Sequence, residues 1–105
     1  GDGRAPGVAL VSAGEDIRVQ RNAAAGRFEI VVDDVVAGFA DYSDADGVRT
    51  FPHTVVDKEF GGRGLAGRMI GEALAVTRDE GLRVRPACEF VERYVQKNPD
   101  SADLA

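Results

Sequence analysis

A glycine-rich stretch before a predicted helix is the strongest chemical signal in the sequence. Phe60–Met69 reads FGGRGLAGRM, and three of the four residues in Gly61–Gly64 are glycine. Glycine lets the backbone approach a ligand closely, and the amides of a helix's first turn point outward without internal partners. Pyrophosphate is a natural ligand for such a site, and Arg63 and Arg68 can add charge-assisted hydrogen bonds. The stretch therefore predicts a phosphate-binding turn.

The same stretch has a second interpretation, which is a tight strand-to-helix connection that binds nothing. It lacks the Gly-Lys-[Ser/Thr] ending of a Walker-type loop. It also follows a series of strands rather than alternating strand–helix units, which argues against a dinucleotide-binding fold. Taken by themselves, these residues leave both alternatives open.

Four runs of alternating apolar and polar residues precede the glycines and predict β-strands. Turn-forming residues separate the runs at Asn22–Gly26, at Asp33-Asp34 and at Asp44–Gly47. Connections this short favour an antiparallel meander. The predicted strands are Asp16–Gln20, Arg27–Val32, Val35–Ser43 and Val48–Val56.

The apolar period changes after Gly64, which predicts a helix with one apolar stripe. Gly81 is a helix-stop residue at its far end. The stripe consists of Leu65, Ala66, Met69, Ile70, Ala73, Leu74 and Thr77.

A short strand over Leu82–Cys88 and a second helix over Glu89–Lys97 complete the predicted elements, and Asn98-Pro99 ends the last helix. The order is β-β-β-β-α-β-α, an α+β fold with a mixed α/β-type sheet. A right-handed crossover through the first helix makes strands four and five parallel, while the others are antiparallel.

These motifs together resemble the GNAT superfamily of N-acetyltransferases. The acetyl-CoA motif of that superfamily has the form [Gln/Arg]-x-x-Gly-x-[Gly/Ala]. In this sequence Gly64 and Ala66 match it, whereas Gly61 stands in place of the usual Gln or Arg and has no side chain to make that contact. The strand residues His53–Val56 precede the motif as they do in the superfamily.

The resemblance extends over Ile17–Pro99 and is closest to a small single-domain subgroup. Pro86–Cys88 and Lys97–Pro99 carry it toward the end of the chain. That subgroup lacks the two helices that larger relatives place after the first strand, and only Asn22–Gly26 separates the first two strands here. The resemblance implies a minimal GNAT-like fold whose strands four and five splay apart.

The resemblance also implies acetyl-CoA as co-substrate. The backbone near Thr54–Val56 would bind the pantetheine arm, and the glycine turn would bind the pyrophosphate. Asn98 either hydrogen-bonds the coenzyme or only caps the chain. The implied coenzyme-binding residues are Thr54, Val55, Val56, Gly61, Gly62, Arg63, Gly64, Leu65, Ala66, Gly67, Arg68 and Asn98.

Three side chains are candidates for the chemistry of acetyl transfer. Cys88 lies near the implied thioester position, where it could accept the acyl group, donate a proton or only line the pocket; we favour the lining role. His53, the only histidine, could act as a general base, a role that histidine often has in enzymes, or it is structural. Tyr94 could donate a proton, as a tyrosine often does in larger relatives, or pack in the core, which its spacing from Phe90 slightly favours.

Composition limits the remaining possibilities. The chain has 105 residues, a net charge of −5 and one cysteine, which predicts one domain over residues 15–105 after a flexible tail over residues 1–14, in a reducing cytoplasm. The acidic balance argues against nucleic acid or a membrane as partner. No cluster has metal-ligand spacing, so we expect no metal.

Three functions fit these observations. The first is an acetyl-CoA-dependent N-acetyltransferase acting on a small-molecule or protein amine, which the acidic first half of the chain would favour. The second is a non-catalytic acyl-CoA-binding or sensing module. The third is an interaction domain whose glycine turn binds nothing. The sequence favours the first, and it fits a monomer or a weak homodimer equally.

Overall fold

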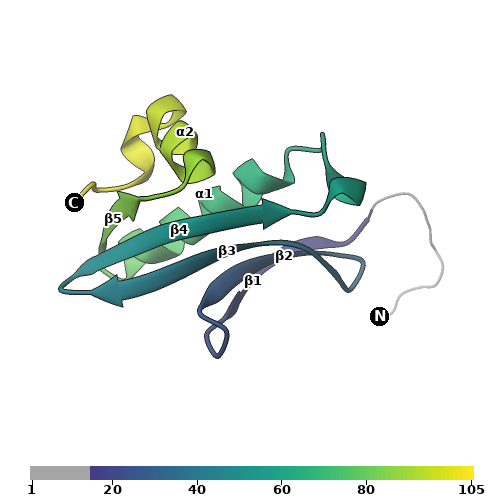
Figure 1. The fold of residues 1–105 in the computed structure, drawn as a ribbon, viewed down its shortest axis with the longest axis horizontal. Coiled ribbons are helices and arrows are strands. Elements are labelled where there is room, and N and C mark those ends of the chain that lie inside the picture. The colour runs from purple at the N-terminus through teal and green to yellow at the C-terminus, as the bar shows by residue number, and fades with distance from the viewer. Residues whose placement is uncertain (1–14) are drawn as a thin grey trace.

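The computed structural model describes residues 15–105, so the tail predicted over residues 1–14 lies outside the described residues. Five strands and two α-helices follow in the predicted order, which confirms the α+β class (Figure 1). Two short 3-10 helices, which were not predicted, follow β4 and α2. The elements are β1 (Ile17–Asn22), β2 (Arg27–Val32), β3 (Val35–Ala45), β4 (Val48–Val56), η2 (Lys58–Phe60), α1 (Leu65–Asp79), β5 (Arg83–Pro86), α2 (Glu89–Lys97) and η3 (Pro99–Ser101).

The sheet has the strand order β1-β2-β3-β4-β5. The first four strands are antiparallel, and β5 is parallel to β4, as the crossover predicted. The β3–β4 turn is shorter than predicted, because Asp46 (φ 54°) and Gly47 (φ 77°) alone adopt the left-handed conformation of a two-residue hairpin. Strand β3 therefore continues to Ala45.

A bulge interrupts β4 in its middle. Asp41 of β3 pairs with His53, but Ser43 pairs with Thr50, so β4 has one residue more than β3 between these pairs. An extra residue reverses the alternation of side chains along the bulged strand. The sequence pattern did not reveal this reversal.

The reversal decides which side chains of β4 meet the helices. Phe51 before the bulge and Thr54 after it are both buried, three positions apart rather than two or four. His53 is exposed and Val55 is half-buried, on the opposite side of the strand. We call this side of β1–β4, which α1 does not contact, the outer face.

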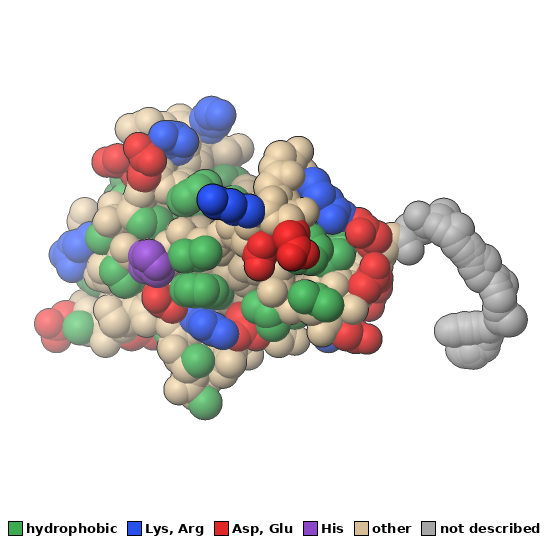
Figure 2. Space-filling view, turned by 45° about the vertical axis from the view of Figure 1, so that its right-hand side comes forward, with side chains coloured by type: hydrophobic (Ala, Val, Ile, Leu, Met, Phe, Trp, Pro, Cys, Tyr) green, Lys and Arg blue, Asp and Glu red, His purple; other side chains and the backbone are tan. Residues whose placement is uncertain are grey.

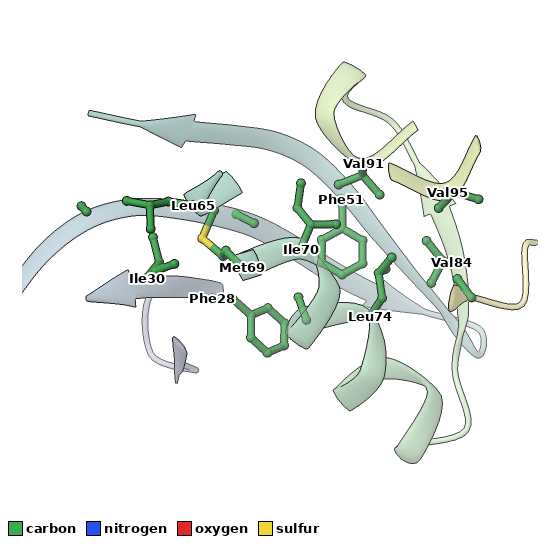
Figure 3. Packing of buried hydrophobic residues seen from close by; sticks show 14 of the residues in the cluster. Phe28, Ile30, Phe51, Leu65, Met69, Ile70, Leu74, Val84, Val91 and Val95 are labelled. Atoms are coloured by element: carbon green, nitrogen blue, oxygen red, sulfur yellow. The ribbon is translucent and has the colours of Figure 1, made fainter. Parts of the chain in front are cut away.

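Helix α1 crosses the inner face of the sheet and contacts β2, β3, β4 and β5. Helix α2 packs beside α1, and Val91 and Val95 bring it into the same core as Val84 of β5 (Figure 3). The stripe predicted for α1 is this core surface, since six of its seven residues are buried. They are Leu65, Met69, Ile70, Ala73, Leu74 and Thr77.

The segment after η3 covers the far edge of the sheet. The amide of Val84 donates to the carbonyl oxygen of Asp103 at 2.8 Å, and the amide of Ala105 donates to the carbonyl oxygen of Val84 at 2.9 Å. These bonds satisfy backbone groups of β5 that would otherwise be unpaired.

A buried arginine joins the β3–β4 hairpin to the end of α1. Arg49 is 1% exposed, and it donates twice to the carboxylate of Asp44, at 2.7 Å each. It also pairs with Glu80 at 2.8 Å and donates to the hydroxyl of Thr77 at 3.2 Å. Arg21 of β1 reaches Glu80 as well, at 2.5 Å. This ionic cluster lies at the opposite end of α1 from the glycine turn.

We expect the ionic cluster to make folding sensitive to acid. The hydrogen bonds from Arg49 lower the pKa of Asp44, and those from Arg21 and then Arg49 lower the pKa of Glu80. A depressed pKa in the folded state gives stability that is present above the unfolded value of about 4 and is lost as the pH falls through the folded value.

Urea denaturation from pH 7 downward should therefore show a nearly constant free energy of unfolding to about pH 5 and a decline below it. In the double variant Asp44→Asn/Glu80→Gln the decline should be smaller. An equal decline in both proteins would show that the cluster is not its cause.

Candidate active site

A groove opens at the start of α1, where β4, the glycine turn and both helices meet. Its volume is ≈ 400 Å³, within the range of about 300–1,000 Å³ that is typical of small-molecule sites. Seven of the predicted coenzyme-binding residues line it together, from the end of β4 to the first turn of α1. They are Val56, Gly61, Gly62, Arg63, Gly64, Leu65 and Ala66.

The glycines keep the floor of the groove open. Gly62 (φ 73°) and Gly64 (φ 71°) are in the left-handed conformation, which strongly favours glycine. A Cβ atom added to either residue would meet nothing within 4 Å. Within residues 15–105 the amides from Gly62 to Gly67 donate to no backbone oxygen, because the first helical bond runs from Arg68 to the carbonyl oxygen of Gly64. These donors are available to an anion.

Two of the basic residues near the groove contact Glu15 and Ile17, at and just before the start of β1. Arg63 forms an ion pair with Glu15, and Arg68, outside the groove lining, donates to the carbonyl oxygen of Ile17 at 3.1 Å. Lys58, from η2, also lines the groove. The groove therefore combines unpaired amides with Lys58 and with Arg63, whose charge Glu15 partly offsets, and this donor set suits a phosphate.

Sequence reasoning missed three lining residues. Phe60 begins the glycine motif but was not assigned a contact, Lys58 lies in an unpredicted 3-10 helix, and Phe90 is on α2. Phe90 is 44% exposed, although the helical spacing suggested a core residue. A large apolar side chain at the exposed start of a helix is a signal that could have identified it.

Strands β4 and β5 separate beside the groove. Their pairing ends at Phe51 and Pro86, and one further bond runs from the amide of Ala87 to the carbonyl oxygen of Phe51. Strand β4 then continues to Val56 without β5 alongside. The chain leaves β5 and turns into α2, which leaves an unpaired edge of β4 that faces α2.

Thr54 and Cys88 face each other across this separation. The Thr54 Oγ1 and Cys88 Sγ atoms are 3.2 Å apart, and either can be the donor. Thr54 is 7% exposed, and Cys88 is half-buried at the N-cap of α2. Neither residue lines the groove; they meet where β4 faces the start of α2.

The structure places His53 apart from Cys88. Its ring centroid lies 6.0 Å from that of Phe39 on β3, and Asp41 is its partner in the register. These residues belong to the outer face, whereas Thr54, the next residue along β4, points toward Cys88. The strand itself thus separates the two candidate groups.

Tyr94 and Asn98 have contacts within the helices. The Tyr94 hydroxyl lies against Gly71 of α1, where an added Cβ atom would be 2.6 Å away. The Asn98 side chain donates to the carbonyl oxygen of Tyr94 at 3.0 Å and so caps the end of α2. Two predicted coenzyme contacts, Val55 and Gly67, are also outside the lining of the first groove, and Val55 lines a different groove on the outer face.

Gly71→Ala should destabilise the protein by about 1 kcal/mol, because the new methyl group displaces Tyr94. Gly67→Ala is the matched control, since it lies in the same helix and its added Cβ would meet nothing within 4 Å; it should stabilise by about 0.5–1 kcal/mol through helix propensity. Urea denaturation measures both. Introducing Tyr94→Phe should restore part of the loss in Gly71→Ala. Equal stabilisation by both single variants would show that Tyr94 moves aside freely.

We expect Cys88 to remain unacetylated. Its thiol is outside the groove lining and contacts Thr54, which suits a residue that packs between β4 and α2. Intact-mass analysis after incubation with acetyl-CoA and no acceptor should show no adduct, and Cys88→Ser should keep most of the activity. A stable single acetyl group that maps to Cys88 would contradict this role.

No group of three or more His, Cys, Asp or Glu side chains in residues 15–105 is placed to hold a metal ion. In a separate test of the described part of the chain, no helix has the length and apolar character to cross a membrane.

Comparison with known proteins agrees with this geometry. The family model for GCN5-related N-acetyl-transferase matches residues 27–104. The solution NMR structure of a GCN5-like protein from Staphylococcus aureus has the same fold, with a TM-score of 0.62 and 20% sequence identity over 80% of this chain and 82% of that chain. A search of curated proteins finds no match. Because the family model covers most of the sequence, the chain belongs to the GCN5-related N-acetyltransferase family of enzymes.

Proposed function

We propose that this enzyme uses acetyl-CoA and transfers the acetyl group to an amine. The observation that carries the proposal is the groove at the start of α1, where open glycines, unpaired amides and the side chains of Lys58 and Arg63 line one space. A pyrophosphate fits such a donor set. Acetyl-CoA, when bound, supplies an activated thioester.

The residues of the chain would divide the binding as follows. The amides of Gly62–Gly67 would hold the pyrophosphate, and Lys58 and Arg63 would add charge. Phe60 and Phe90 provide apolar walls. The unpaired edge of β4 near Thr54–Val56 offers backbone groups to the amide-containing pantetheine arm, in the way that an extended segment pairs with a strand edge.

The transfer needs a neutral amine and a fate for one proton. The amine nitrogen bonds to the carbonyl carbon, the carbon–sulfur bond breaks with its electron pair staying on sulfur, and the amine proton reaches the leaving thiolate. His53 is our candidate for the base that takes this proton from the amine. Tyr94 stays a candidate donor to the thiolate, although its hydroxyl lies against Gly71. A cytoplasmic location also stays a prediction.

Two measurements test this function in sequence. Acetyl-CoA should raise the melting temperature, because a ligand that binds only the folded state stabilises it. With acetyl-CoA at saturation, a panel of small amines should then release free CoA thiol at a rate that depends on the acceptor. If acetyl-CoA raises the melting temperature but no amine releases CoA thiol, the protein binds the coenzyme and catalysis is refuted. If acetyl-CoA does not raise the melting temperature and no CoA thiol is released, the groove is refuted as a coenzyme site.

A further inference from the structure

A second groove lies on the outer face, which no helix of residues 15–105 covers. Its volume is ≈ 250 Å³, and its walls include Arg27, Phe39, Val55 and Asp57. This volume is below the range of drug-sized ligands, so only a small molecule fits. Figure 2 shows the single histidine on this side of the molecule, in purple, beside apolar side chains in green.

We infer that this second groove binds the acceptor, and that the acceptor is a small amino acid, a molecule with both an amine and a carboxylate. The inference rests on the acetyl transfer proposed above. It is carried by three features of the outer face, which are an arginine held in place with donors to spare, an apolar wall, and a candidate base, His53, that lies beside the groove against Phe39 and outside the groove lining.

Arg27 is held in position from two directions. Its Nε atom donates to the carboxylate of Glu29 at 2.8 Å, and its guanidinium carbon lies 4.5 Å from the centre of the Phe39 ring. Within residues 15–105 its two terminal nitrogens form no hydrogen bond or ion pair. An arginine fork that is already ordered binds a carboxylate with two parallel bonds and little loss of entropy.

Glu29 is a fixed support for Arg27. It is 3% exposed, and its carboxylate accepts hydrogen bonds from Gln20 at 2.8 Å and Asn22 at 3.1 Å in addition to Arg27. The bond from Gln20, followed by those from Asn22 and Arg27, lowers the pKa of Glu29. Glu29 is thus charged and fully engaged, and its position aims Arg27 into the groove.

The same Phe39 ring connects Arg27 to His53. His53 contacts the ring at a centroid distance of 6.0 Å, so a ligand that spans Phe39 with its carboxylate on Arg27 brings its amine toward His53. Val55 lies beside Phe39 in the register and suits a short carbon chain. Two carboxylates can attract the ammonium form. Asp41 is opposite both Arg27 and His53 in the register, and Asp57 on the groove wall accepts a hydrogen bond from the amide of Glu59 at 3.0 Å.

Charge favours an amino acid over a polyamine in this groove. A diamine would place a second cation near Arg27, and like charges at short range repel. A carboxylate in that position instead gains a charge-assisted pair. The acidic surface elsewhere on the chain attracts a diamine more strongly than a net-neutral amino acid, so the preference for an amino acid rests on Arg27.

The test compares acceptors that differ only in the carboxylate. The pairs are lysine with cadaverine and 4-aminobutyrate with propylamine, and the readout is release of CoA thiol at saturating acetyl-CoA. We expect kcat/KM to be about 10- to 100-fold higher for at least one amino acid than for its matched amine, as loss of a charged hydrogen-bonded partner implies.

Arg27→Gln should remove this advantage, so that each amino acid reacts no faster than its matched amine. Arg18→Gln is the matched control, because Arg18 is an exposed arginine of β1 and should keep the advantage. Arg27→Lys is the second variant in case Arg27→Gln folds poorly; it keeps a cation beside Glu29 but loses the fork, and it should lose most of the advantage.

A binding measurement separates failure of this inference from failure of the proposed function. The isotope-labelled protein is titrated with 4-aminobutyrate and followed by NMR, and the amide signals of Arg27, Phe39 and Val55 should shift. These signals should not shift when propylamine replaces 4-aminobutyrate, or when the Arg27→Gln variant is titrated with 4-aminobutyrate. Shifts without CoA release support the groove and count against catalysis. Amines that react as well as amino acids, or 4-aminobutyrate that shifts none of these amides, overturn the inference and leave the coenzyme groove intact.

Discussion

Gly64→Val should fold and lose acetyl-CoA affinity by about 100-fold, which corresponds to about 2.8 kcal/mol. Gly64 is at the N-cap of α1, with φ 71° and nothing within 4 Å of an added Cβ atom. The valine side chain would therefore project into the groove, over the amides that we assign to the pyrophosphate. Calorimetric titration with acetyl-CoA measures the change.

The control for Gly64→Val is Gly47→Val. Gly47 has a similar φ of 77° and the same open surroundings, but it lies in the β3–β4 turn, at the other end of the molecule. Backbone strain of about 1–3 kcal/mol is expected in both variants, whereas only Gly64→Val obstructs the groove. Unchanged affinity in a folded Gly64→Val protein would contradict the assignment. Arg63→Ala should weaken binding less, because charge contacts at an exposed phosphate are screened by salt.

Arg49→Ala should destabilise the protein by about 3 kcal/mol. The change removes a side chain that is 1% exposed and leaves a cavity beneath the Tyr42 ring, which lies 4.6 Å from the guanidinium carbon. It also leaves Asp44 and Glu80 without their shared cation, although both carboxylates are exposed enough to regain water.

The free energy of unfolding in urea at neutral pH measures this effect. Arg18→Ala is the control, since Arg18 is an exposed arginine that pairs only with exposed carboxylates; its cost should be within about 0.5 kcal/mol. A cost below about 1 kcal/mol for Arg49→Ala would show that the buried ion pairs offset little more than their own desolvation.

The regular elements could be predicted because their residues repeat with the period of the structure they form. The stripe of α1 and the strands Arg27–Val32 and Val48–Val56 appear at the predicted positions. The glycine turn was predictable for a related reason, since left-handed backbone and open space at Gly62 and Gly64 require glycine itself. A backbone conformation that requires glycine can therefore be recognised from the residue type alone.

Features that depend on relations between distant segments could not be predicted. The bulge in β4 arises from the register with β3, and it alone decides that Thr54 faces Cys88 while His53 faces outward. The ionic cluster around Arg49 joins segments from β1 to the end of α1. In the same way, the role of Arg27 and Glu29 could not be predicted, because residues of β1 and β3 hold this pair in place.

Titration of the isotope-labelled protein with acetyl-CoA, followed by NMR, tests the coenzyme groove most directly. We predict that the largest changes in amide shift will fall on Gly61–Gly67, with further changes at Thr54–Val56, because these backbone groups line the groove and the open edge of β4. Changes confined to the outer face near Arg27 and Phe39 would contradict the account. The absence of any change at about 1 mM acetyl-CoA, which is the upper end of usual KM values, would also contradict it.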